Sequence, residues 1–129
     1  MACIIIIDDK ADILETMSVF LSSLGHDVHT YMQADLALDF IENNTVDLVI
    51  TDTLMPVMNG CELMSAIQTN PIKRDIPIVA MSGGAMDTIN CAVLNGAMKK
   101  ANVFLKKPVS PDVLKKTVNA LMQGIPEYV

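Results

Sequence analysis

The chain has 129 residues, of which 51% are hydrophobic, and its 9 Lys and Arg against 15 Asp and Glu give a formal net charge of −6 at pH 7. A chain of this length buries about two-thirds of the surface that its unfolded form exposes, so one domain can fold without disulfides or structural metals. A net negative charge without clustered Lys and Arg argues against direct binding to nucleic acid or to an anionic membrane surface.

Apolar runs of strand length recur along the chain. In chain order they are Cys3–Ile7, Val28–Tyr31, Leu48–Ile50, Ile78–Met81 and Val103–Leu105. Most of these runs are continuous rather than alternating, which is typical of parallel strands covered by helices on both faces. The run at Val28–Tyr31 is weaker and predicts an edge strand.

A helical pattern follows each run, with apolar residues at the three- and four-residue spacing of one helix face. The residues predicted to face the core are Ile13, Leu14, Met17, Phe20, Leu21 and Leu24, then Leu36, Ala37, Phe40 and Ile41, then Leu63, Met64 and Ile67, and finally Val113, Leu114, Val118, Leu121 and Met122. A further helix is predicted from about Asp87 to Lys100, between the fourth and fifth runs.

Capping residues predict where several helices begin and end. Gly25 ends the first helix at a C′-like position. Asn59 is the predicted N-cap of the third helix, with Glu62 three residues later as in a capping box. Ser110 and Pro111 are typical of a helix that begins with a serine cap and a proline in its first turn.

Five repeats of strand and helix with short connections predict an α/β fold, an open and doubly wound parallel sheet. No linker or internal repeat interrupts the pattern, so we predict one domain over residues 1–124 and a short C-terminal tail over residues 125–129. No stretch approaches the ~20 apolar residues of a membrane-spanning helix.

The spacing of the cysteines and histidines shows no metal-binding signature. Cys3, Cys61 and Cys91 are far apart and outside any CxxC or Cys/His ligand spacing, so we predict reduced thiols with packing roles in a cytoplasmic protein. His26 and His29 lack an acid or cysteine partner at a plausible ligand spacing. We therefore predict surface or edge-strand roles for both histidines.

Polar residues follow the apolar runs at the point where a binding site is expected in an open α/β sheet, beyond the carboxyl ends of the strands. They are Asp8 and Asp9 after the first run, Asp52 after the third, Ser82 and Gly83 after the fourth, and Lys107 after the fifth. Taken singly, each residue has an ordinary interpretation, such as a helix cap, a plain loop or a solvated charge. Their joint placement at four strand ends favours a functional site.

This set of residue types points to phosphoryl chemistry. Neighbouring carboxylates repel one another unless a cation lies among them, and oxygen-only ligands suit Mg²⁺. A carboxylate that the metal and Lys107 partly neutralise can attack phosphorus and form an aspartyl phosphate. Ser82 and the backbone N–H groups around Gly83 would then hold phosphoryl oxygens.

At these residues the chain resembles the receiver domain of two-component response regulators, over essentially all of its length. The D-x-x-x-P-x-x-x-G spacing of Asp52, Pro56 and Gly60, with the later pair Lys107–Pro108, carries the resemblance. It implies the flavodoxin-like receiver fold, with five parallel strands in the order 2-1-3-4-5 and five flanking helices. It also implies a signalling domain that is not a conventional enzyme but catalyses its own aspartyl phosphorylation and dephosphorylation.

By that resemblance, Asp52 would accept a phosphoryl group from a histidine kinase or a histidine phosphotransfer protein. Asp9, Asp52 and the backbone carbonyl of Leu54 would bind Mg²⁺ directly, and Asp8 would act through a water molecule. Lys107 would pair with the phosphorylated aspartate, because the lysine of the family directly precedes a proline. The bond that follows Lys107 would be cis, whereas Lys106 would be solvated.

The resemblance also implies a switch. Thr53, Ser82, Gly83 and Lys107 would contact the phosphoryl group. Phosphorylation would draw the Ser82 hydroxyl toward it, and Phe104 would rotate inward to fill the space that opens. The fourth helix, fifth strand and fifth helix would then present a changed face to a downstream protein. An ordinary core aromatic is an equal alternative for Phe104.

Three other functions share part of this pattern. A phosphatase of the haloacid dehalogenase type would place a second aspartate where this chain has Leu54. A flavodoxin-like electron carrier would place a phosphate-binding loop where this chain has Asp8 and Asp9. The serious alternative is a receiver-like interaction module that does not use phosphorylation, and the retained acids, Ser82 and Lys107 speak against it.

Overall fold

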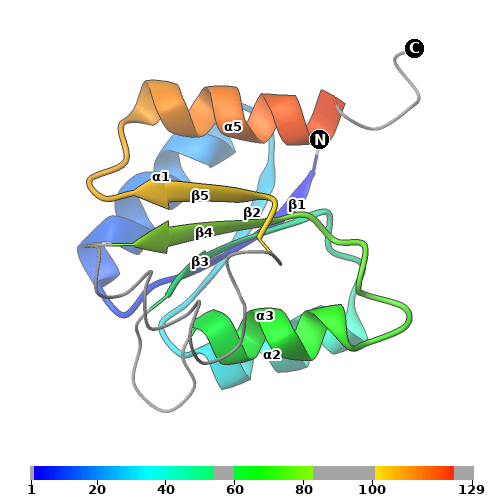
Figure 1. The fold of residues 1–129 in the computed structure, drawn as a ribbon. Coiled ribbons are helices and arrows are strands. Elements are labelled where there is room, and N and C mark those ends of the chain that lie inside the picture. The colour runs from blue at the N-terminus through cyan, green and yellow to red at the C-terminus, as the bar shows by residue number, and fades with distance from the viewer. Residues whose placement is uncertain (1, 54–59, 83–100, 124–129) are drawn as a thin grey trace.

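Five parallel strands form one sheet with helices on both faces (Figure 1). The computed structural model describes residues 2–53, 60–82 and 101–123. The elements are β1 (Cys3–Ile7), α1 (Ala11–Ser23), β2 (Asp27–Tyr31), α2 (Ala34–Asn43), β3 (Leu48–Asp52), α3 (Gly60–Gln68), β4 (Ile78–Ser82), β5 (Val103–Lys106) and α5 (Pro111–Gln123). The predicted helix over residues 87–100 and the predicted cap Asn59 lie outside the described residues. Within those residues, no helix is both long enough and apolar enough to cross a membrane.

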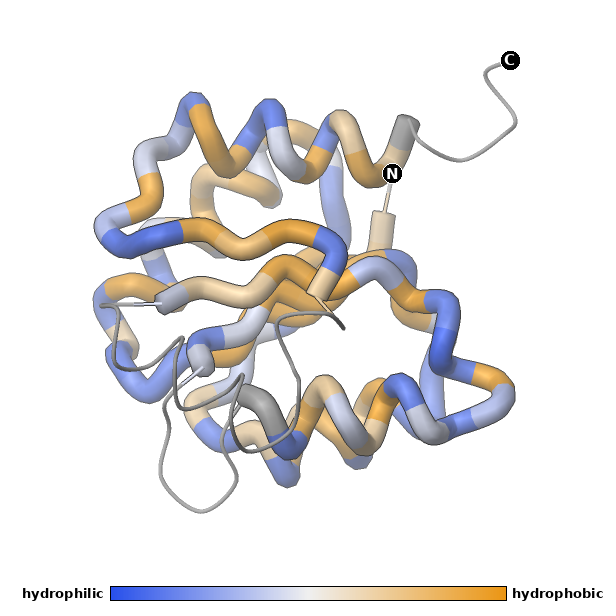
Figure 2. Tube along the Cα trace, viewed as in Figure 1, coloured by the Kyte–Doolittle hydropathy of each residue, from blue (hydrophilic) through white to orange (hydrophobic). Residues whose placement is uncertain are grey.

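The strand order is β2-β1-β3-β4-β5 and every neighbouring pair is parallel, which confirms the predicted fold class. The strands β3 and β4 are buried along their whole length, because helices cover both faces of the sheet. Figure 2 shows the hydrophobic residues concentrated in the strands. The weaker run, β2, is an edge strand as predicted.

The two fully buried strands, β3 and β4, extend beyond the carboxyl ends of their apolar runs. The ladder continues through Thr51 and Asp52 in β3 and through Ser82 in β4, where Asp52 pairs with Met81 and Ser82 with Lys106. Backbone groups form this ladder of hydrogen bonds. A strand can therefore continue through polar residues as long as the neighbouring strand still pairs with it. The extension carries the polar residues into the sheet itself and buries them.

Alternate residues of each strand point to opposite faces and form two cores. Ile5 and Ile7 of β1 pack with buried residues of α2 and α3. Ile4 and Ile6 pack with buried residues of α1 and α5. Figure 1 shows the same two helical layers on either side of the sheet. The continuous apolar strands are thus explained by burial on both faces.

Three residues predicted to face the core are exposed instead. Leu36 is 56% exposed, Val113 is 43% exposed, and Leu24, the C-cap residue of α1, is 37% exposed. In α2 the buried positions are Ala34, Ala37 and Ile41, and at about 100° per residue Leu36 points away from all of them. Val113 lies in the first turn of α5, one residue before Leu114, and Leu114 belongs to the buried face of that helix.

The predicted caps at two helix ends are confirmed. Gly25 has a φ of +94° and lies just beyond the C-cap of α1, where its N–H donates to the carbonyl of Ser22 at 3.0 Å. The hydroxyl of Ser110 accepts a hydrogen bond from the N–H of Val113 at 3.2 Å and thereby caps α5.

Replacing Ser110 by alanine is expected to lower the free energy of unfolding by about 1 kcal/mol, because the N–H of Val113 loses its capping oxygen. Urea denaturation monitored by circular dichroism measures the change. Ser110→Thr keeps the cap and is expected to lie close to the unsubstituted protein. Equal losses in the two variants would show that the cap contributes nothing.

Candidate functional site

The carboxyl edge of the sheet gathers the polar residues that follow the strands. Asp8 directly follows β1, Asp52 ends β3, Ser82 ends β4 and Lys107 directly follows β5. Asp8 is 0% exposed, Asp52 is 4% exposed and Ser82 is 3% exposed. Burial of this many polar groups in a small area is costly unless they neutralise one another or bind a ligand.

Lys107 bridges two of the acids. Its Nζ lies 2.7 Å from Oδ2 of Asp8 and 3.2 Å from Oδ2 of Asp52. Burial alone would lower the pKa of Lys107, but its hydrogen bond to Asp8 and the charges of Asp52 and Asp8 outweigh burial and raise the pKa above its ordinary value. The ammonium therefore stays charged throughout the neutral range.

One ammonium does not balance three acids. Carboxylate oxygens of Asp8, Asp9 and Asp52 all lie within 4.8 Å of one another. In the described part of the chain, the buried Oδ1 of Asp9 has no hydrogen-bond partner, and Nζ of Lys10 lies 4.0 Å from it. A carboxylate oxygen without a hydrogen-bond partner inside an oxygen-only cluster fits Mg²⁺, which prefers hard oxygen ligands. The residues present therefore suit that ion.

Both carboxylate oxygens of Asp8 are engaged. Its Oδ2 accepts the hydrogen bond from Lys107, and its Oδ1 accepts one from the backbone N–H of Lys10 at 2.9 Å. This agrees with a carboxylate that acts on a metal through water. The predicted carbonyl ligand, Leu54, lies outside the described residues.

Two hydroxyl-bearing residues lie beside the acids. Thr53 is 1% exposed, and among the described residues its Oγ1 has no hydrogen-bond partner. Its backbone N–H donates to the carbonyl of Met81 at 3.0 Å, so the hydroxyl is the group left for a ligand. The carbonyl of Ser82 accepts the backbone N–H of Lys107 at 2.7 Å, which ties the ends of β4 and β5 together. Gly83 lies outside the described residues.

The two consecutive lysines have different environments. Lys106 ends β5 and is exposed, whereas the side chain of Lys107 is only 16% exposed. The Lys107–Pro108 peptide bond is cis, as the resemblance implied. The lysine before the proline is thus the one that reaches the acids.

Phe104 lies in β5 opposite Ala80 of β4. It is half-buried and packs against the core formed with α2 and α3. The predicted fourth helix, which would complete the face around it, lies outside the described residues.

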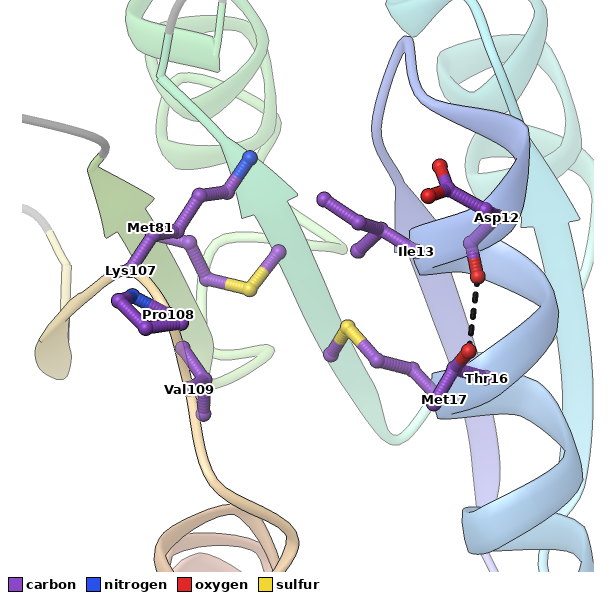
Figure 3. A pocket seen from close by; sticks show the side chains of 8 residues that line it. All are labelled: Asp12, Ile13, Thr16, Met17, Met81, Lys107, Pro108 and Val109. Atoms are coloured by element: carbon purple, nitrogen blue, oxygen red, sulfur yellow. Dashed lines mark hydrogen bonds between the residues drawn. The ribbon is translucent and has the colours of Figure 1, made fainter.

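A groove of about 370 Å³ borders the acidic edge, a feature that the sequence did not indicate. Figure 3 shows Ile13 and Met17 of α1 facing Met81 and Pro108 across it. Ile13 and Met17 were predicted only as core residues. Because Lys107 also lines this groove, apolar surface lies directly beside the bridging ammonium.

The predicted edge-strand role of His29 is confirmed, because it lies in β2, but the prediction that it lacks an acid or cysteine partner is wrong. Asp27 precedes His29 by two residues, and the register of β1 with β2 places Cys3 opposite Asp27. His29 therefore has an acid and a cysteine as neighbours. Nε2 of His29 lies 3.1 Å from Oδ2 of Asp27. Burial, together with the nearby carboxylates of Asp27 and Asp47, raises the pKa of the Cys3 thiol above its ordinary value. The spacing of Asp27 and His29 places them on one face of a strand, but only the pairing of β1 with β2 brings Cys3 to them.

Fold and site together define a protein of the flavodoxin-like receiver class. A family model described as the response regulator receiver domain matches residues 4–119. The chain therefore belongs to the response regulator receiver family, whose members are signalling domains rather than conventional enzymes.

Known proteins resemble the chain over most of its length. The 3′,5′-cyclic-nucleotide phosphodiesterase regA of Dictyostelium discoideum is 29% identical over 95% of this chain and 15% of its own length. The signal receiver domain of a histidine kinase from Syntrophus aciditrophicus has 26% identity and a TM-score of 0.87, with 98% of this chain and 94% of that chain covered. The response regulator TrrA of Thermotoga maritima, solved in complex with Mg²⁺–BeF, has 26% identity and a TM-score of 0.80, with 94% and 99% covered.

The chain spans only part of the first curated relatives that it matches, 15% of one and 54% of another. Those relatives therefore carry additional sequence beyond the region they share with this chain.

Proposed function

We propose that this chain is a phosphoacceptor module of a two-component or phosphorelay pathway, in which Asp52 takes a phosphoryl group from a phosphohistidine donor. One observation carries the proposal: the buried Asp52 carboxylate lies 3.2 Å from the Lys107 ammonium and within 4.8 Å of the Asp8 and Asp9 carboxylates. The donor is a histidine kinase or a histidine phosphotransfer protein. The domain spans residues 1–124, which include the matched region 4–119, and residues 125–129 form a tail.

The proposed metal ligands are those that the family resemblance implies, and the contacts of the described acids support them. Asp9, Asp52 and the backbone carbonyl of Leu54 bind Mg²⁺, and Asp8 acts through a water molecule because its own oxygens are already engaged. Bound there, the ion supplies positive charge beside the acids and the incoming phosphoryl oxygens. The solved complex of TrrA with Mg²⁺–BeF supports this choice of ion.

The transfer itself uses residues of the chain. A carboxylate oxygen of Asp52 attacks phosphorus, an O–P bond forms and the N–P bond of the donor breaks, and the electron pair stays on the imidazole nitrogen. Lys107 stabilises the negative charge that collects on the phosphoryl oxygens, since its raised pKa keeps it protonated. Thr53 and Ser82, with the backbone N–H of Gly83, contact the remaining oxygens.

The downstream signal passes through β5 and α5 together with the predicted helix over residues 87–100. Ser82 moves toward the phosphoryl group, and Phe104, which now packs at the edge of one core, rotates inward. An unidentified target protein reads the changed face. Because the described Cys3 thiol is free, we place the protein in a reducing compartment, the cytoplasm.

Incubation with acetyl phosphate followed by intact mass measurement tests the proposal. The unsubstituted protein is expected to gain a single phosphate adduct with Mg²⁺ and none with a chelator, and Asp52→Asn is expected to gain none in either condition. Asp75→Asn, which changes an exposed acid, is the matched control and keeps the adduct.

The same experiment identifies the alternative function. If no adduct forms, even with a phosphorylated histidine donor and rapid quenching, the chain is a receiver-like interaction module that does not use phosphorylation. An adduct that survives in Asp52→Asn would assign phosphoacceptance to another residue.

A further inference from the structure

A second group of potential metal ligands lies away from the acidic edge. Cys3 of β1 and Asp27 and His29 of β2 each offer one ligand atom, and these three atoms lie within 4.8 Å of one another. Cys3 begins β1 and Asp8 follows its end, so at ~3.3 Å per residue the two groups are about 16 Å apart along the strand. This group is therefore separate from the proposed phosphorylation site.

Strand pairing brings the three side chains to one face of the sheet. In the register of β1 and β2, Cys3 is opposite Asp27 and Ile5 is opposite His29. Cys3 and His29 both lie on the face covered by α2, since Cys3 packs against that core and the ring of His29 lies 4.7 Å from the ring of Phe40. The ring contact limits how far the imidazole can turn.

The distances suit a small tetrahedral ion. Two ligand atoms at ~2.0–2.1 Å from a tetrahedral metal are about 3.3 Å apart, and a sulfur at ~2.3 Å lies about 3.5 Å from a nitrogen ligand. Nε2 of His29 and Oδ2 of Asp27 are already 3.1 Å apart. The sulfur of Cys3 lies within 4.8 Å of the other two ligand atoms. Each of these two distances therefore has to shorten by at most about 1.3 Å, which small side-chain rotations can supply.

The chemistry of the ligands separates this group from the first site. A thiolate, an imidazole and a carboxylate suit a borderline ion such as Zn²⁺, whereas Mg²⁺ prefers oxygen ligands alone. A further carboxylate, that of Asp47, accepts the backbone N–H of Cys3 at 2.8 Å and adds negative charge beside the thiol. The Asp27 side chain is 61% exposed and that of His29 is 36% exposed, so an ion from solvent can reach both.

We propose that Cys3, Asp27 and His29 form a binding site for a Zn²⁺-like divalent transition metal, with three protein ligands and a fourth position open to water. On binding, the sulfur–metal bond forms as the thiol loses its proton to solvent. The ion then fastens the edge strand β2 to β1. The site does not depend on phosphorylation of Asp52, because none of its ligands belongs to the acidic edge.

Titration with Co²⁺ in the presence of excess Mg²⁺ tests the proposal, because a cobalt–thiolate bond gives a charge-transfer band in the near ultraviolet that oxygen ligands do not give. The unsubstituted protein is expected to show the band at one equivalent of Co²⁺ and to lose it when Zn²⁺ is added. Cys3→Ser is expected to abolish it, and Asp27→Asn and His29→Gln to weaken Co²⁺ affinity at least about tenfold. Cys61→Ser, Cys91→Ser, His26→Gln and Asp52→Asn are the controls and keep the band.

A second measurement needs no substitution at Cys3. Zn²⁺ is expected to slow alkylation of Cys3 in the unsubstituted, folded protein at least about tenfold, as followed by peptide mass, whereas Mg²⁺ has no effect. Absence of the charge-transfer band, or a band that persists in Cys3→Ser, would overturn the proposal. Unchanged alkylation of Cys3 in saturating Zn²⁺ would do the same.

Discussion

Replacing Lys107 by methionine is expected to lower the free energy of unfolding by about 3–5 kcal/mol at pH 7 in the absence of divalent ions. The substitution keeps the aliphatic bulk but removes the ammonium that lies 2.7 Å from Asp8 and 3.2 Å from Asp52. Both acids are almost completely buried, so neither can recover its lost partner from bulk water. Urea denaturation of both proteins measures the difference.

The pH dependence of that difference follows from the raised pKa of Lys107. A base whose pKa is higher in the folded state contributes stability that is fully present below the unfolded value, about 10.4, and that is lost as the pH rises through the folded value. The difference in free energy of unfolding between the unsubstituted protein and Lys107→Met is therefore expected to stay constant from neutral pH to about pH 9. It is expected to shrink above about pH 10.4.

Lys106→Met is the matched control, because it makes the same chemical change one residue earlier at an exposed position. It is expected to change the free energy of unfolding by less than about 0.5 kcal/mol. Similar losses in the two variants would mean that the contacts of Lys107 with the acids contribute nothing specific.

Whether Asp9→Asn or the unsubstituted protein is the more stable is expected to depend on Mg²⁺. Without the ion, the variant is the more stable protein by about 1 kcal/mol, because one of three mutually repelling carboxylates is gone. With Mg²⁺ at about 100 times its dissociation constant, the unsubstituted protein gains about 2.7 kcal/mol and becomes the more stable one. Thermal unfolding in a Mg²⁺ series measures both changes.

The reversal depends on Oδ1 of Asp9, a buried oxygen without a hydrogen-bond partner in the described residues. Asp35→Asn removes an exposed acid from the first turn of α2 and is the control, with the Mg²⁺ response expected to be unchanged. If Mg²⁺ stabilises Asp9→Asn as strongly as the unsubstituted protein, Asp9 is not a ligand of the ion.

Much of the fold could be predicted from local pattern. The buried strands β1, β3 and β4 are continuous apolar runs that only a sheet covered on both faces accommodates. The positions of Asp8, Asp52 and Lys107 directly after or at the ends of strands then predict a shared edge, because the carboxyl ends of parallel strands lie together. Helix faces are less predictable, and the prediction that Leu24, Leu36 and Val113 face the core is wrong.

By itself, the sequence determined the class of fold and which residues gather at the acidic edge, since apolar periodicity and strand ends are properties of short segments. Only the tertiary structure decided which groups the oxygens of Asp8 contact, which carboxylate oxygen of Asp9 lacks a hydrogen-bond partner, and that Cys3 meets Asp27 and His29. The contact of Lys107 with Asp8 and the approach of Cys3 to Asp27 and His29 join residues far apart in the chain. They depend on strand order and register, which the packing of the whole sheet against its helices determines.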